Sequence, residues 1–143
     1  MPYSPLLVRP MREELTAAGF EELRTPEEVD RFLAAPAGTA LLVVNSVCGC
    51  AAGMARPGVR LALQAGPRPE RLGTVFAGQD VDATARARSF FADLPPSSPS
   101  MFLFKNGELV WALPRHRIEG RDALAVAQEL RAAFERHCAT VAV

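Results

Sequence analysis

This chain of 143 residues has only three cysteines and two histidines, and its formal net charge is zero. Three cysteines are too few for the disulfide framework of a secreted protein, and clustered thiols in a reducing compartment more often serve metal or redox chemistry. Sixteen basic residues balance sixteen acidic ones, so no overall field favours nucleic acid or an anionic membrane as a partner. Apolar runs such as residues 40–44 are far shorter than the roughly 18 residues that suggest a membrane span.

The N-terminal segment also lacks the apolar stretch of an export signal, because Arg9, Arg12, Glu13 and Glu14 interrupt it. We therefore expect a cytoplasmic protein. The composition is 49% hydrophobic and 22% charged, which is typical of globular proteins, and the length suits one domain. We expect a single domain over residues 1–143.

The first part of the chain predicts two helices and a short strand. Leu7, Met11, Leu15 and Ala18 are apolar at helical spacing, and Gly19 is a natural C-terminal stop. Residues 20–23 fit a short edge strand. In residues 25–28, Thr-Pro-Glu-Glu supplies an N-cap threonine, a proline at the first helical position and a capping-box glutamate.

The rest predicts a mixed sheet flanked by helices on both faces, an α/β fold. Residues 40–44 and 73–77 read as strands, and residues 51–64 as a helix that Pro57 interrupts, so the two strands should be parallel. Asn106-Gly107 between two apolar runs predicts a hairpin. Two further helices are expected from apolar residues at helical spacing: Ala83, Ala87, Phe90 and Phe91, then Leu124, Ala127, Leu130 and Phe134.

Cys48-Gly49-Cys50 lies between the first long strand and the helix that follows it. Cys48 should therefore sit at or just before a helix N-terminus, where unpaired N–H groups and the helix dipole lower the pKa of a thiol. We expect Cys48 to attack and Cys50 to resolve. Gly49 can adopt backbone angles closed to other residues, which lets the pair form a tight disulfide ring.

Two other interpretations of the cysteines remain open from the residues alone. A free cysteine is often a small buried hydrophobic residue. A zinc site needs three or four protein ligands, which here would be Cys48, Cys50, Cys138 and one of His116 or His137. That arrangement requires the C-terminus to reach the cysteine loop.

Several segments, taken in order, resemble the bacilliredoxin family of thioredoxin-like proteins: PMREELTAAGFEEL, VVNSVCGCAAGMARPG, VFAGQD, PSSPSMFLFKNGE and PRHRIEG. The resemblance implies a thioredoxin-like fold and removal of the small thiol bacillithiol from protein mixed disulfides, with disulfide isomerase activity in the wider group. It implies Cys48 as nucleophile and Cys50 as its partner, with no cofactor and bacillithiol as cosubstrate. The partners would be thiolated or disulfide-containing client proteins, with no nucleic acid and no membrane.

The segment SPSMFLFKNGE is also similar to thioredoxins and places Pro99 where that fold carries a cis-proline. Gly49, Ser98 and Pro99 are the expected substrate-binding residues. The chain departs from thioredoxins in the closer spacing of its cysteines, and residues 41–44 are wholly apolar where thioredoxins carry a buried acid. His116 and its neighbouring arginines either bind an anionic thiol or form a solvated loop.

Three functions remain after these observations. The first is removal of a small thiol from client proteins, and the second is isomerisation of protein disulfides. The third belongs to another class, a metal-binding module built on the thiols.

Overall fold

A computed structural model describes residues 2–34 and 37–138 of the chain. Its centre is a five-stranded sheet in the order β1-β3-β2-β4-β5. The strands are β1 (Glu21–Glu22), β2 (Thr39–Asn45), β3 (Arg71–Phe76), β4 (Ser100–Lys105) and β5 (Glu108–Leu113). β1, β3 and β2 run parallel, whereas β4 and β5 are antiparallel to their neighbours.

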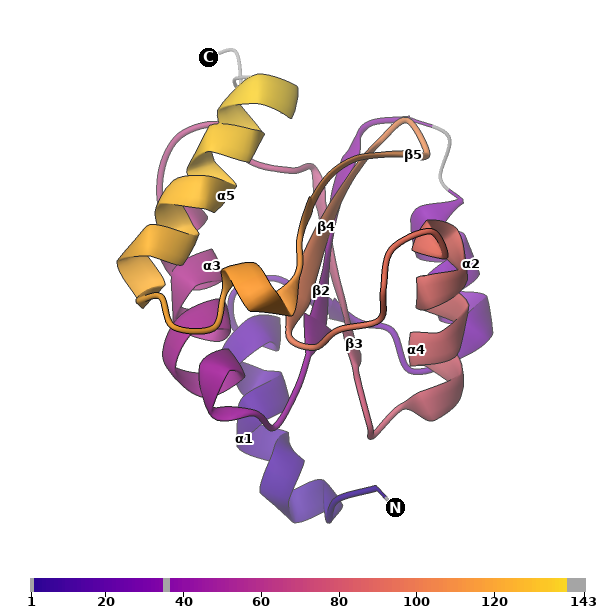
Figure 1. Ribbon diagram of the computed structural model, residues 1–143. Coiled ribbons are helices and arrows are strands. Elements are labelled where there is room, and N and C mark those ends of the chain that lie inside the picture. Colours follow the sequence, from indigo (N-terminus) through magenta and orange to yellow (C-terminus); the bar gives the residue numbers. More distant parts are fainter. Residues whose placement is uncertain (1, 35–36, 139–143) are drawn as a thin grey trace.

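Helices cover both faces of this sheet (Figure 1). On one face lie α1 (Pro5–Thr16), α3 (Arg56–Ala62) and α5 (Ala123–His137), and on the other lie α2 (Pro26–Leu33) and α4 (Val81–Arg88). The predicted fold class, an α/β protein with a mixed sheet between helices, is confirmed. None of the helices in the described ranges is both long and apolar enough to cross a membrane.

Strand β2 occupies the middle of the molecule, and all seven of its residues are buried. Its side chains alternate between two cores, as successive residues of a strand must. Leu41 and Val43 pack with α1, α3 and α5, whereas Leu42 and Val44 pack with α2 and α4. Because both faces are covered by helices, the strand is apolar throughout rather than alternating.

Local signals place the predicted turns and helix starts correctly. Thr25 and Glu28 form both hydrogen bonds of a capping box at the start of α2. Asn106 and Gly107 have φ angles of 52° and 83°, so the hairpin between β4 and β5 uses the positive φ that was expected. The proposed edge strand exists as β1, paired with β3.

Two predicted helix faces were wrong at their first residue. In α1 the buried residues are Val8, Arg12 and Leu15, while Leu7 is 51% exposed. The face turns because Arg12 is held inward by hydrogen bonds to Asp80 and Glu22. In α5, Leu124 is 56% exposed, and Val126 packs into the core against α3 instead.

Pro57 does interrupt the helix after the cysteines. The chain makes a π-helical turn, η1 (Ala51–Ala55), before α3 begins at Arg56. Proline has no N–H to donate to the carbonyl four residues earlier, so the regular α-helical ladder cannot continue through it. Two short 3₁₀ segments, η2 (Ser89–Phe91) and η3 (Arg115–Arg117), follow α4 and β5.

Candidate redox site

The register of the sheet brings three distant segments to one end of β2. Val44 of β2 pairs with Ser100 of β4, and Met101 pairs with Leu113 of β5. The turn after β2, the residues before β4 and the residues after β5 therefore meet at the same edge. These segments carry the predicted site residues: Cys48, Gly49, Cys50, Ser98 and Pro99.

Cys48 lies at the N-terminus of the helical segment, as predicted. Its carbonyl oxygen accepts hydrogen bonds from the N–H groups of Ala51 and Ala52, at 2.9 and 3.2 Å. Its own N–H donates to Oγ of Ser46 at 3.0 Å. Cys48 is partly exposed, whereas Cys50, the N-cap of η1, is buried.

The two sulfur atoms are free thiols 2.7 Å apart. The hydrogen bond from the Cys50 thiol is the largest cause that lowers the pKa of Cys48, and the Cys50 backbone N–H adds to it. Burial is the largest cause that raises the pKa of Cys50, followed by the hydrogen bond and charge of Cys48. Cys48 is therefore the sulfur suited to attack, since the thiolate is the reactive form.

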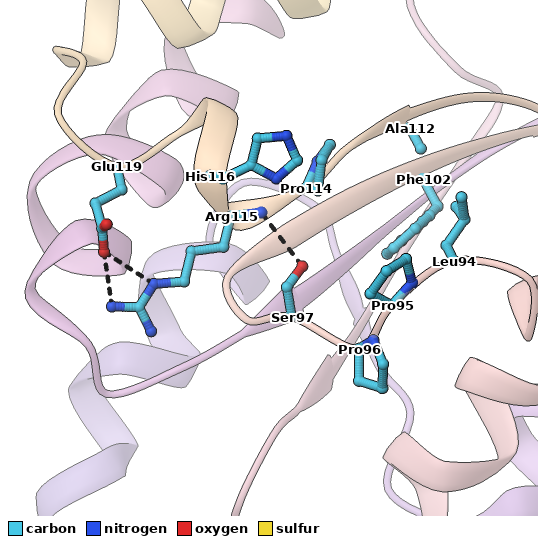
Figure 2. A pocket seen from close by; sticks show the side chains of 10 residues that line it. All are labelled: Leu94, Pro95, Pro96, Ser97, Phe102, Ala112, Pro114, Arg115, His116 and Glu119. Carbon is cyan, nitrogen blue, oxygen red and sulfur yellow. Dashed lines mark hydrogen bonds and ion pairs between the residues drawn. The ribbon is translucent and has the colours of Figure 1, made fainter.

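Arg115 supplies a positive charge beside the pair. It begins η3, where its N–H donates to Oγ of Ser97 at 3.2 Å and its guanidinium reaches the carbonyl of Ser98 at 3.4 Å. The same guanidinium forms an ion pair with Glu119 at 2.9 Å (Figure 2). Its charge favours the thiolate form of both cysteines. It therefore contributes to the lowered pKa of Cys48 and opposes the rise in the pKa of Cys50.

Arg56 lies beneath the turn and is almost fully buried, with 1% of its surface exposed. It donates to Oδ1 of Asn45 and to the carbonyl of Ser46, both at 2.9 Å. Its Nε forms an ion pair with Glu14 at 3.2 Å, without the geometry of a hydrogen bond. Asn45 Oδ1 also accepts the Ser46 N–H, so these bonds brace the residues that lead into Cys48.

The sequence did not predict the parts played by Arg115 and Arg56. Arg115 appeared only as a neighbour of His116, and the order of residues does not show that the end of β5 lies beside the cysteines. Arg56 carries a charge, and charged residues are almost never fully buried unless paired. The sequence signal that was available is the position of Arg56 on the helix that follows the cysteines, one residue before Pro57.

The Ser98–Pro99 peptide bond is cis, as the likeness to thioredoxins predicted. Pro99 is buried, Ser98 is partly exposed and Gly49 is exposed. A Cβ atom added to Gly49 would meet no heavy atom within 4 Å outside the two neighbouring cysteines, so the space beside Gly49 is open.

Cys138 lies at the opposite end of the sheet. It shares a cavity with Thr39, the first residue of β2, whereas Cys48 follows Asn45, the last residue of that strand. Seven residues of strand span roughly 20 Å. The metal site considered from the sequence needed Cys138 beside the pair, and this placement contradicts it; His137 lies in the same distant cavity. No group of three or more potential metal ligands occurs among the described residues.

Solved structures with low sequence identity share this fold. A structure described as a putative oxidoreductase with a thioredoxin fold has a TM-score of 0.55 and 17% identity, covering 80% of this chain and 91% of its own. Thioredoxin from Fasciola hepatica has a TM-score of 0.55 and 18% identity, covering 82% and 99%. These likenesses define the class by its fold: the chain is a thioredoxin-fold protein, and its paired cysteines follow the central strand.

Close relatives then give the family. The family model described as "Disulphide isomerase" matches residues 3–138. A bacilliredoxin of Halalkalibacterium halodurans is 52% identical over 136 residues, which is 95% of this chain and 94% of the relative. Bacilliredoxins of Geobacillus kaustophilus (53%; 94% and 92% covered) and Salinibacter ruber (54%; 96% and 82%) are equally similar. This chain belongs to the bacilliredoxin family, as its segments around the CGC motif predicted.

Proposed function

We propose that this protein removes bacillithiol from mixed disulfides of client proteins, with Cys48 as the nucleophile. The observation that carries the proposal is the asymmetry of the pair: a partly exposed sulfur with a lowered pKa lies against a buried sulfur with a raised pKa. The name of the relatives supports bacillithiol as the small thiol. The reaction requires reduced cysteines, and we therefore propose that the protein acts in the cytoplasm.

In the first step the Cys48 thiolate attacks the bacillithiol sulfur of the mixed disulfide. A new bond forms between Cys48 and that sulfur, and the bond from bacillithiol to the client cysteine breaks. Its electron pair leaves with the client sulfur, which takes up a proton from water. The client recovers its thiol, and Cys48 carries the small thiol.

In the second step Cys50 loses its proton to water and its thiolate attacks the sulfur of Cys48. A bond forms between the two cysteines, the bond from Cys48 to bacillithiol breaks, and bacillithiol leaves as a thiolate. Burial is the largest cause that raises the pKa of Cys50 and persists throughout, and in the free protein two further causes raise it, the hydrogen bond and the negative charge of Cys48. Both are lost once Cys48 is in a mixed disulfide, whereas the charge of Arg115 still lowers the pKa of Cys50. Formation of the adduct therefore activates the resolving cysteine. The resulting disulfide regains two electrons from an external thiol or dithiol.

We also assign substrate contacts to Gly49, Ser98 and Pro99. The space beside Gly49, which lies between the two cysteines in the chain, is open, so another chain can approach closely there. Ser98 and Pro99 lie at the same sheet edge as the pair, because the residue after them, Ser100, pairs with Val44 of β2.

The proposal is tested with Cys50→Ser and a bacillithiolated client. Mass spectrometry should show the client restored to its free thiol and one bacillithiol adduct on Cys48. Cys48→Ser should give neither product, because serine is not appreciably ionised at neutral pH. Restoration of the client by Cys48→Ser, with the adduct on Cys50, would reverse the assigned roles. Equal reaction with a glutathionylated client would refute the preference for bacillithiol.

Disulfide isomerisation is the second candidate, favoured by the description of the matching family. Isomerisation needs Cys48 to attack a client disulfide and Cys50 to release the enzyme when rearrangement stalls. Refolding of a scrambled disulfide protein separates the two activities. An isomerase should restore the native pairing in the absence of bacillithiol.

A further inference from the structure

A cavity of about 420 Å³ opens beside the redox site. Its volume lies within the roughly 300–1,000 Å³ typical of ligand pockets. One wall is the loop before Pro99, the floor comes from β4 and β5, and the far end is η3 (Figure 2). The residues of the wall and floor are Leu94, Pro95, Pro96, Phe102 and Ala112.

The wall and floor of this cavity are apolar, and its polar side chains, Ser97, Arg115, His116 and Glu119, lie toward one end. Ser97 accepts the backbone N–H of Arg115, and the Arg115 guanidinium is paired with Glu119. A ligand rich in hydroxyl groups would lose hydrogen bonds to water and find few replacements here, which is costly. An apolar side chain has no such requirement, and Leu94, with 37% of its surface exposed, would be covered by it.

The cavity is lined by residues that lie next to the cysteine site. Ser97 lines it, and the next two residues, Ser98 and Pro99, lie at the sheet edge that carries the cysteine turn. Arg115 also lines it, while its charge acts on both sulfur atoms. A polypeptide whose bacillithiolated cysteine lies against Cys48 for attack therefore has this cavity within reach of its neighbouring residues.

We infer that the cavity binds an apolar side chain of the client polypeptide, aliphatic or aromatic, close in sequence to the thiolated cysteine. This inference rests on the proposed function, because it names what that reaction recognises besides the mixed disulfide. According to this inference, the residues that distinguish one client polypeptide from another are those around Phe102 and Ala112, rather than those of the cysteine turn.

The test uses peptides that carry one bacillithiolated cysteine and a leucine moved through the flanking positions, with serine elsewhere. Placed correctly, the leucine should raise kcat/KM roughly tenfold or more over the all-serine peptide. Ala112→Phe fills the cavity and should abolish this gain. Leu94→Ser, at an exposed position, should reduce it with little effect on folding. Leu109→Phe, on the same strand but outside the cavity, is the matched control and should keep it.

Hydroxyethyl disulfide, which has no polypeptide, separates this inference from the proposed function. Wild type and Ala112→Phe should react with it at equal rates. Equal kcat/KM for all peptides in the wild type would overturn the inference and leave the exchange reaction standing. A wild type that reacts with hydroxyethyl disulfide but with none of the bacillithiolated peptides would overturn the proposed function itself.

Discussion

The Cys50 thiol is the main reason for the lowered pKa of Cys48, and this dependence can be measured at single-residue scale. Cys50→Ser keeps a hydrogen-bond donor, whereas Cys50→Ala removes it. The pKa of Cys48 should therefore be higher in Cys50→Ala than in Cys50→Ser. On acidification, the alkylation rate of Cys48 should fall at a higher pH in Cys50→Ala. Rates of alkylation against pH, measured on a Cys138→Ser background, give both midpoints. Identical midpoints would show that the side chain at position 50 does not stabilise the Cys48 thiolate.

Arg56 supports the turn from below, and its removal should cost stability. Arg56→Met loses the hydrogen bonds to Asn45 and to the Ser46 carbonyl, which becomes a buried acceptor without this donor. We expect a loss of about 1–3 kcal/mol in the free energy of unfolding. The stability of Arg56→Lys should lie between those of the wild type and Arg56→Met.

Urea denaturation measures this loss, and Arg60→Met is the control. Arg60 lies one turn further along α3 and is exposed, so its replacement should change the free energy of unfolding by less than about 0.5 kcal/mol. Equal effects of the two replacements would contradict a bracing role for Arg56.

At the scale of elements, the contact between α3 and α5 depends on a glycine. A Cβ atom at Gly58 would lie 2.6 Å from Cγ1 of Val126 and 3.1 Å from the carbonyl oxygen of Ala123. Gly53, earlier in the same helical segment, has no such neighbour within 4 Å. Replacing either glycine by alanine brings a similar gain in helix propensity. The difference in the free energy of unfolding between the two variants therefore measures the packing cost.

Gly58→Ala should therefore be less stable than Gly53→Ala by about 1–3 kcal/mol, the usual cost of overpacking. Thermal or urea denaturation of the two variants provides the comparison. Equal stabilities would mean that α5 moves away from α3 at little cost.

At the scale of the whole molecule, the sheet separates the third cysteine from the other two. Cys138 lies near Thr39 at one end of β2, and Cys48 follows the other end. Cys138→Ser should leave the rate of bacillithiol release unchanged within about twofold, since roughly 20 Å prevents a direct sulfur exchange. Turnover assays and mass spectrometry of Cys50→Ser check this. Transfer of the adduct from Cys48 to Cys138 would require the C-terminal helix to leave the sheet.

The sequence by itself determined the elements whose signals are local. The Thr25–Glu28 capping box, the Asn106-Gly107 turn and the apolar run in β2 each depend on a few consecutive residues, so their physics does not require the rest of the fold. The cysteine pair was found in the same way, because a strand, a turn and a helix start surround it. The family likeness added the cis bond before Pro99.

Only the tertiary structure decided which distant segments meet. Arg115 reaches the cysteines because β5 pairs with β4 and β4 with β2, and this register depends on contacts far apart in the chain. Arg56 is buried because Asn45, Ser46 and Glu14 converge on it. The cavity at Phe102 and the separation of Cys138 follow from the same pairing. Local patterns carry no information on such contacts, because each side chain meets its partner only after the sheet has formed.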